Sequence, residues 1–517
     1  MWLLLVLLFG FAIRFAAIDF QSLWRDEIDA GGFGAPEMRM GEALAAGDLQ
    51  ALAQTLIQRG FNGPLYFMAL QQWMRIAGDT AFALRFPSAL FGALAIPLIY
   101  ILARRLLRGT QAERYSRPVG LIAAWLAASS PYFVWYSQET RMYTEVTALA
   151  MAAIYALRRA VDASDGRRAW PWWVLVVAAT TLAIYSHILA ALLIGVEIVL
   201  FLLWWPQSKS HWLGGLIALA ALTLPYLPLF VWQLTLALTP GSQGFAFYGF
   251  DQILQKMLAG FASGVLSFEH SLSAVGVEWN ADAVTPALRP AMWGLWLLSL
   301  LAIAGALLWR GWQDCSRRIG LAAWALIPVA TIALVSLNRP VFTDRYLIWI
   351  GPAIYLLAAL GIVDIGQWRR ALGGAALVAL TGVALVSTVA QSTTPYKADF
   401  RSAASYLEER YQGEAIVFQI PYGRYNLDYY FDPAFPYLEG PYTNHRNPDG
   451  SYQVNAATAD AQFADLFRGQ KAVWLVATEV EMWDDRHLLQ EWLGRNGRLT
   501  DPADFTGVVV ARYELGP

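Results

Sequence analysis

The sequence has little charge and a single cysteine. Asp, Glu, Lys and Arg make up 15% of its 517 residues, whereas a soluble domain carries about 25%. Because Cys315 is the only cysteine, an intramolecular disulfide and a cysteine-based metal cluster are excluded. The formal net charge of −2 gives no electrostatic indication of a nucleic-acid partner. With 57% hydrophobic residues, the chain is expected to be a polytopic membrane protein.

Apolar runs long enough to cross a bilayer recur through the first three quarters of the sequence. The first run has no basic stretch ahead of it and no small-residue cleavage site, so we expect a retained anchor. Since a span needs about 18–20 apolar residues, we expect about 11 transmembrane helices. They are placed near residues 1–19, 86–104, 118–136, 142–158, 170–186, 188–205, 212–234, 291–309, 319–337, 346–364 and 371–390.

Lys and Arg are concentrated in alternate loops between these runs, which predicts the orientation. Short loops rich in Lys and Arg face the cytoplasm. The N-terminus is therefore expected inside and, with an odd number of spans, the C-terminus outside. The loop cations are Arg104, Arg105, Arg108, Arg114, Arg117, Arg158, Arg159, Arg167, Arg168, Lys209, Arg310, Arg317, Arg318, Arg369 and Arg370.

Three segments are extracytoplasmic in this topology. The loop of residues 20–85 contains a helical pattern over 38–60 and an amphipathic stretch over 64–77, which is expected at the membrane surface. The loop 235–290 has a length typical of lids and binding loops. Residues 391–517 change abruptly to the composition of a soluble domain, so we divide the chain into a transmembrane domain, 1–390, and an extracytoplasmic domain.

Helical and strand patterns alternate in the tail. Helices are expected over 399–411, 459–467 and 484–496, and buried strands over 415–420, 472–477 and 507–513. This alternation favours a small α/β domain with a mostly parallel sheet. No Gly-rich phosphate loop follows the first strand, which argues against a nucleotide-binding unit.

Two adjacent acids follow the first span, in the sequence LWRDEID at residues 23–29. Asp26 and Glu27 could act as a general base, hold a metal ion or belong to a solvated turn. The pair alone does not distinguish these roles.

Further polar residues lie at the expected outer ends of other spans. Glu139 and Arg141 occupy a tight hairpin, His187 ends another span, and Arg345 opens a span against the positive-inside bias. An interfacial aromatic belt, a structural histidine and an ion pair between Arg345 and Asp344 are the alternative interpretations. Acids and arginines at headgroup depth suit one reaction, in which a carboxylate deprotonates an acceptor hydroxyl while cations stabilise a phosphate leaving group.

Several short motifs carry a family resemblance. They are LWRDE (23–27), GPLY (63–66), GD followed by FALRFPSALFG (78–92), WYSQE and RMY (135–143), YSH (185–187), RY (345–346) and DFRSAASYL (399–407). In these motifs the sequence resembles the GT-C membrane glycosyltransferases. The closer likeness is to the dolichyl-phosphate-mannose–protein mannosyltransferase family and its bacterial relatives, including the lipid A aminoarabinose transferases.

The resemblance implies an inverting transfer from a polyprenyl-phosphate-linked sugar on the extracytoplasmic side. Asp26 matches the first-loop acid and is implied to be the general base. Glu27 is implied to orient the acceptor or to assist Asp26. Glu139 matches the second acidic position. Arg141 and Arg345 are implied to bind the donor phosphate. The remaining donor-side candidates are Tyr346, His187 and Arg85, of which Arg85 matches a recurrent arginine with either a phosphate or a structural role.

Two departures from the family pattern bear on the acceptor. Many bacterial relatives have His-Pro-Pro-Leu-Tyr where this chain has Asn-Gly-Pro-Leu-Tyr at 62–66, and Asn62 replaces that histidine only as a neutral hydrogen bonder. Asn62 and Tyr66 are candidate acceptor or loop contacts. The tail lacks the β-trefoil insertion of eukaryotic protein mannosyltransferases. This absence makes a protein acceptor less favoured than a glycan or lipid acceptor. We expect no required metal, although Asp26 and Glu27 could hold Mg²⁺ or Mn²⁺.

Two other functions fit a chain of this kind. A flippase of lipid-linked sugars would favour charges near the bilayer midplane and paired repeats, which are not evident here. A polysaccharide polymerase or ligase would not need the acidic pair after the first span.

Overall fold

The computed structural model describes residues 1–33, 63–227, 246–266, 312–447 and 449–516. They form two compact units, the first comprising Met1–Ile18, Gly47–Gly78 and Phe82–Thr393, and the second comprising Asp19–Ala46, Asp79–Ala81 and Thr394–Pro517. The helix predicted over 38–60, the span near 291–309 and most of the loop 235–290 lie outside the described residues.

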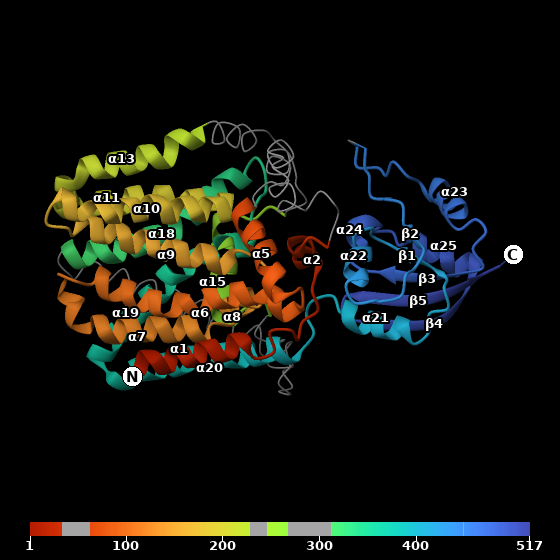
Figure 1. The fold of residues 1–517 in the computed structure, drawn as a ribbon, viewed down its shortest axis with the longest axis horizontal. Helices are drawn as coiled ribbons and strands as arrows, with labels where there is room; N and C mark the ends of the chain where they lie inside the picture. The colour runs from red at the N-terminus through yellow and green to blue at the C-terminus, as the bar shows by residue number, and fades with distance from the viewer. Residues whose placement is uncertain (34–62, 228–245, 267–311, 448, 517) are drawn as a thin grey trace. The chain divides into compact units, whose positions relative to one another are not determined.

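The first unit is a bundle of helices (Figure 1). The helix predicted over 64–77 is confirmed as α5, and the segment 235–290 contains helix α15. The helices are α1 (Trp2–Phe15), α5 (Pro64–Ala77), α6 (Ala81–Leu106), η2 (Gln111–Tyr115), α7 (Ser116–Ser129), α8 (Pro131–Ser137), α9 (Tyr143–Val161), α10 (Gly166–Ser186), η3 (Ile188–Ala191), α11 (Leu192–Leu203), α12 (Trp205–Ser208), η4 (Lys209–His211), α13 (Trp212–Thr223), η5 (Leu224–Tyr226), α15 (Phe250–Ser263), α18 (Trp312–Ser336), η6 (Asp344–Ile350), α19 (Gly351–Trp368) and α20 (Arg370–Thr393).

Five helices among the described residues are long and apolar enough to cross a membrane, or up to seven if two bent pairs are each one span. One of these pairs, α7 and α8, bends by 58°. The break follows from Pro131, which starts a new helix, while Ser130 Oγ accepts a hydrogen bond from the Phe133 N–H at 3.2 Å. The count of eleven spans remains a prediction.

A buried arginine fixes α1 against α7 and α8. Arg14 is 1% exposed, and its guanidinium donates to the carbonyls of Ala127 and Ala128 at 2.9 and 3.0 Å and to Ser137 Oγ at 3.2 Å. A charge inside an apolar bundle is stable only with such partners. The contact with Ser137 holds the end of α8, from which the chain turns into α9.

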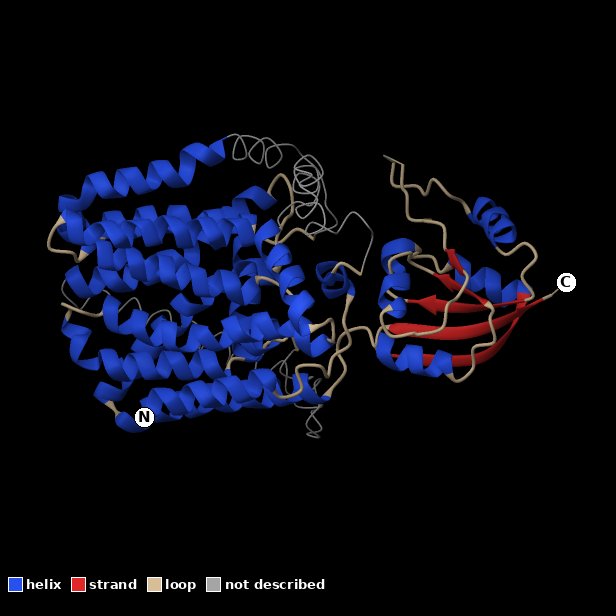
Figure 2. Cartoon of the chain, viewed as in Figure 1, coloured by secondary structure: helices blue, strands red, loops and turns tan. Residues whose placement is uncertain are grey.

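The second unit contains a five-stranded sheet in the order β2-β1-β3-β5-β4 with helices on both faces (Figure 2). Helices α23 and α25 cover one face, and α21 and α22 the other. The elements are α21 (Phe400–Glu408), β1 (Ala415–Phe418), α22 (Gly423–Asp428), β2 (Tyr437–Glu439), α23 (Ala456–Leu466), β3 (Ala472–Ala477), α24 (Val480–Trp483), α25 (Leu488–Asn496), β4 (Gly497–Phe505) and β5 (Val508–Leu515).

The prediction of a mostly parallel sheet is confirmed only in part, because β5 runs against the other strands. The pairs β1–β2 and β1–β3 are parallel, but β5 pairs antiparallel with both β3 and β4. The cause is a hairpin between β4 and β5, whose two-residue turn ends in Gly507 with φ +66°. A helix-linked crossover would have been needed to keep these strands parallel.

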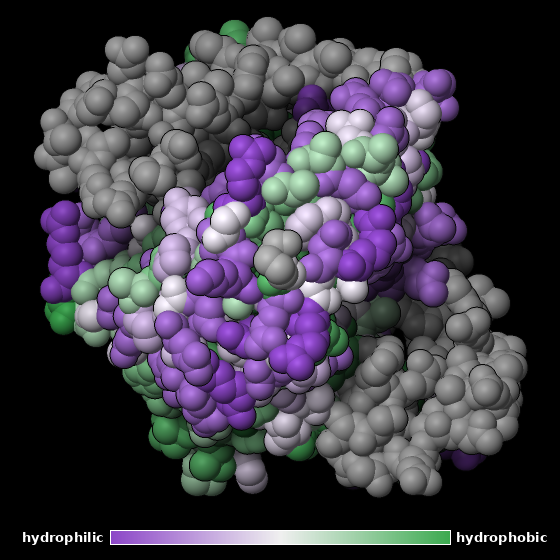
Figure 3. All heavy atoms as spheres, turned by 90° about the vertical axis from the view of Figure 1, so that its right-hand side faces the viewer, coloured by the Kyte–Doolittle hydropathy of each residue, from purple (hydrophilic) through white to green (hydrophobic). Residues whose placement is uncertain are grey.

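The first-loop segment belongs to the second unit. The Gln21 side chain accepts from the N–H groups of Tyr396 and Lys397 and donates to the Thr394 carbonyl. The Leu23 N–H donates to Tyr430 Oη at 2.7 Å. Helix α2 (Arg25–Gly31) follows directly. The acidic motif is therefore folded together with the C-terminal sheet, which the predicted division at residue 390 did not anticipate. Figure 3 shows the hydrophilic side chains gathered over this unit.

Candidate active site

Polar side chains from three segments meet at one end of the first unit's bundle. They come from the turn between α8 and α9, from the residue after α10, and from η6. The His187 ring lies 4.8 Å from the ring of Tyr346 and 6.3 Å from that of Tyr143. The guanidinium of Arg141 lies 5.8 Å from the Tyr143 ring, and that of Arg345 lies 5.9 Å from the Tyr346 ring. We refer to Arg141, Tyr143, His187, Arg345 and Tyr346 as the arginine cluster.

The turn that presents Arg141 is held by hydrogen bonds. The Arg141 N–H donates to the Glu139 carbonyl at 2.7 Å, and the Arg141 carbonyl accepts from Ser88 Oγ at 2.8 Å. Ser88 Oγ also lies 2.9 Å from Tyr66 Oη. Tyr66 is 3% exposed, so the structure gives it this supporting contact rather than an accessible surface. Asn62 lies outside the described residues.

Within the arginine cluster, Nε2 of His187 and Oη of Tyr143 are buried without a hydrogen-bond partner among the described residues. Leaving such an atom unsatisfied costs about 1–3 kcal/mol. Burial, followed by the charges of Arg141 and Arg345, lowers the pKa of His187 to about 3. The imidazole is therefore neutral at pH 7, and one ring nitrogen can donate a hydrogen bond.

The cluster has the composition of an anion site. Two guanidiniums supply charge and paired donors, and the phenol and imidazole supply neutral donors. Glu139, which is 1% exposed, lies on the same turn as Arg141. Tyr143 stands in the RMY motif but was not among the predicted site residues.

Two other predicted residues have contacts elsewhere in the first unit. Arg85 is fully buried and donates from Nη1 to the Ile18 carbonyl at 2.7 Å, which agrees with its structural alternative. Asp344 lies next to Arg345, and its Oδ2 accepts from Tyr136 Oη at 3.5 Å.

The two adjacent acids of the second unit have different surroundings. Glu27 is fully buried, and its Oε2 accepts from Lys397 Nζ at 2.8 Å. The Lys397 ammonium also lies 5.7 Å from the Trp24 ring. Asp26 is partly exposed. The solvated-turn interpretation therefore fails for Glu27, and Asp26 is the more accessible carboxylate.

A further carboxylate approaches Asp26 from the sheet. Glu479 follows β3 with backbone angles in the left-handed region (φ 44°, ψ 39°). Burial raises the pKa of Glu479, while its charge interacts with those of Arg25 and Asp26. The Arg25 guanidinium lies 4.2 Å from the ring of Tyr422, which follows β1. The motif thus lies at the carboxyl ends of the neighbouring parallel strands β1 and β3. From these two ends the chain continues in opposite directions, and α/β sheets commonly bind ligands at such a point.

Residues 62–232 match a family model described as dolichyl-phosphate-mannose-protein mannosyltransferase. No curated protein sequence matches the chain. The crystal structure of ArnT from Cupriavidus metallidurans bound to undecaprenyl phosphate is similar, with 15% identity, a TM-score of 0.56 and coverage of 99% of this chain and 98% of that one. The apo form of that protein gives 13% identity, a TM-score of 0.57 and coverage of 99% and 97%.

A second protein of similar structure is the oligosaccharyltransferase of Archaeoglobus fulgidus in its apo form. Its identity is 14%, its TM-score 0.52, and the match covers 100% of this chain and 74% of that one. This chain has the GT-C fold of these proteins. The family resemblance in the sequence is thereby confirmed.

Tyrosines after β1 contact the segment that carries the acidic motif. Tyr430 accepts from the Leu23 N–H, and Tyr422 lies beneath Arg25. Tyr429 Oη donates to the Asp79 carbonyl at 2.8 Å.

The described residues include no group of three or more His, Cys, Asp or Glu side chains arranged to hold a metal ion. A cation shared by Asp26 and Glu27 would have to displace the Lys397 ammonium from Glu27. The expectation that no metal is required remains a prediction.

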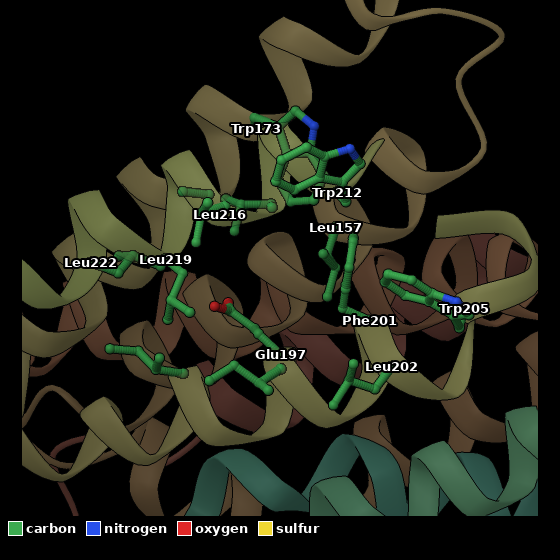
Figure 4. A pocket seen from close by; sticks show the side chains of 15 residues that line it. Leu157, Trp173, Glu197, Phe201, Leu202, Trp205, Trp212, Leu216, Leu219 and Leu222 are labelled. Atoms are coloured by element: carbon green, nitrogen blue, oxygen red, sulfur yellow. The ribbon is translucent and has the colours of Figure 1, made fainter. Parts of the chain in front are cut away.

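An apolar cavity of about 430 Å³ opens among α9, α10, α11 and α13 (Figure 4). Glu197 is its one acid, and Oε1 of Glu197 accepts from Thr180 Oγ1 at 2.6 Å. Leu157, in its lining, follows Tyr143 by fourteen residues on α9, which corresponds to about 21 Å of helix. The cavity is therefore separate from the arginine cluster.

Proposed function

We propose that this GT-C glycosyltransferase moves a sugar from a polyprenyl-phosphate-linked donor to an extracytoplasmic hydroxyl acceptor in a glycan, lipid or protein. The arginine cluster is the observation that carries the proposal, because it combines two guanidiniums with buried, unsatisfied neutral donors. That ArnT has been crystallised with undecaprenyl phosphate supports the choice of lipid.

In the proposed reaction the arginine cluster binds the donor phosphate. Arg141 and Arg345 stabilise the charge that develops when the bond between the sugar and the phosphate breaks. The Tyr143 hydroxyl and the neutral His187 imidazole donate to further phosphate oxygens. Tyr346 holds the His187 ring from the side, at 4.8 Å. Glu139 is too buried to meet an acceptor, so we assign it the role of compensating the cluster's positive charge.

Asp26 is the proposed general base. The acceptor oxygen attacks the anomeric carbon on the face opposite the phosphate, its proton passes to the Asp26 carboxylate, and polyprenyl phosphate leaves as an anion. A single displacement of this kind inverts the anomeric configuration. Asp26 is preferred to Glu27 because the Glu27 carboxylate is buried against Lys397.

The distribution of loop cations supports a cytoplasmic N-terminus, with the reaction and the C-terminal unit on the extracytoplasmic side.

Reconstituted protein tests the proposal directly. Proteoliposomes would receive radiolabelled undecaprenyl-phosphate mannose, glucose or aminoarabinose, together with envelope lipids, glycans and a peptide pool. Incorporation of label into an acceptor, with release of undecaprenyl phosphate, is the expected result and identifies the sugar. Labelled lipid that crosses the bilayer without transfer would instead establish the flippase alternative.

A further inference from the structure

The ion pair between Glu27 and Lys397 joins residues 370 positions apart in the sequence. Lys397 lies between the end of α20 at Thr393 and the start of α21 at Phe400. Its side chain is 6% exposed and that of Glu27 is 0% exposed, so water does not screen the pair. Removing either partner breaks a buried ion pair, which is strongly destabilising.

Helix geometry links this pair to Asp26. Neighbouring residues on an α-helix point about 100° apart, so Asp26 and Glu27 face different directions from α2. With Glu27 drawn inward by Lys397, Asp26 is directed away from that buried position and stays partly exposed. The short helix α2 has only seven residues, so its own hydrogen bonds do little to fix its rotation.

The segment before α2 is tied down independently of Lys397. The Leu23 carbonyl accepts from Asn426 Nδ2 at 3.1 Å, and Ser22 Oγ donates to Asp399 Oδ1 at 2.8 Å. These contacts fix where α2 begins.

We propose that Lys397 is a positioning residue for transfer, which orients the Asp26 carboxylate through its buried ion pair with Glu27. The C-terminal α/β unit is then part of the catalytic apparatus. This inference rests on the proposed function, in which Asp26 is the base.

Four variants test the role of Lys397: Lys397→Ala, Lys397→Arg, Glu27→Lys and the charge swap Glu27→Lys/Lys397→Glu. Arg498→Ala is the matched control, because Arg498 belongs to the same unit but pairs with Glu514 at the surface. For each variant, kcat and KM for transfer are measured per folded molecule, together with the affinity for undecaprenyl phosphate.

Misplacing a reacting group by about 1 Å costs on the order of 100-fold in rate. We therefore expect Lys397→Ala to lower kcat by about 10- to 100-fold, with affinity for undecaprenyl phosphate within about twofold of wild type. Lys397→Arg should retain most of the wild-type kcat, and the charge swap should recover part of it. Arg498→Ala should have the wild-type kcat.

The outcomes separate the inference from the proposed function. If Asp26→Asn abolishes transfer but Lys397→Ala retains wild-type kcat per folded molecule, the positioning role is wrong and the proposed function stands. If kcat falls as far in the charge swap as in Glu27→Lys and Lys397→Ala, the pair has no orienting role. If Asp26→Asn retains the wild-type rate, the base assignment itself fails.

Discussion

Acidification should destabilise this protein through His187. The pKa of this imidazole is lowered to about 3, from an ordinary value of 6.5, by burial and by Arg141 and Arg345. Between those two values the unfolded chain binds a proton that the folded chain does not. Stability contributed by the neutral imidazole is therefore fully present above pH 6.5 and is lost as pH falls toward 3.

The size of the effect follows from the same shift. One pKa unit corresponds to about 1.36 kcal/mol, so at pH 5, which lies about 1.5 units below the ordinary pKa, the loss is about 2 kcal/mol. His187→Gln removes the titrating group while keeping an amide that can donate. Between pH 7 and pH 5, the free energy of unfolding of the variant should therefore fall by about 2 kcal/mol less than that of wild type.

Denaturant titration in detergent micelles, without added lipid, measures this difference. Other groups titrate in the same pH range, so the quantity compared is the change in free energy of unfolding between wild type and variant. His445→Asn is the matched control, because His445 is exposed. Equal pH dependence in wild type and His187→Gln would refute the neutral, buried imidazole and its role as a hydrogen-bond donor.

Two further predictions concern the phosphate site and the C-terminal unit. Arg345→Lys keeps the positive charge but loses the planar guanidinium with its paired donors, so affinity for undecaprenyl phosphate should fall about tenfold in a competition assay. The control Arg369→Lys, at an exposed position, should leave that affinity unchanged. Unchanged affinity in Arg345→Lys would contradict the role of Arg345 in binding phosphate. Asp484 is fully buried and accepts from Gln419 Nε2, Thr443 Oγ1 and the Leu489 N–H at 2.6–3.0 Å. Asp484→Ala should cost about 3 kcal/mol of unfolding free energy, as measured by denaturation or limited proteolysis. The control is Asp460→Ala, which removes an exposed ion pair with Arg495. If Asp484→Ala lowers the unfolding free energy no more than this control, the stabilising role of Asp484 is contradicted.

Sequence patterns predicted the buried elements of the C-terminal unit well. The apolar run 472–477 coincides with β3, because a strand covered on both faces must be apolar along its whole length. Strand β4 was missed because it is an edge strand with exposed side chains and Pro502 in its interior. Without a hydrophobic alternation, its pairing with β5 has no local signal.

Some residues of the candidate site could be predicted from the sequence and others could not. Glu139, Arg141, His187 and Arg345 could be grouped from sequence, because charged residues at the ends of apolar runs are conspicuous. The partners Lys397 and Glu479 could not, since each lies more than 350 residues from the acidic motif and looks like ordinary surface charge in the sequence.

The central claim is that Asp26 is the base in transfer from a polyprenyl-phosphate sugar. The most direct measurement compares wild type with Asp26→Asn in reconstituted transfer, with undecaprenyl phosphate binding measured in parallel. Asparagine preserves shape but does not accept the proton, so transfer should fall by at least about 100-fold while lipid binding is retained. Transfer at the wild-type rate in Asp26→Asn would contradict the account and move the base to another carboxylate.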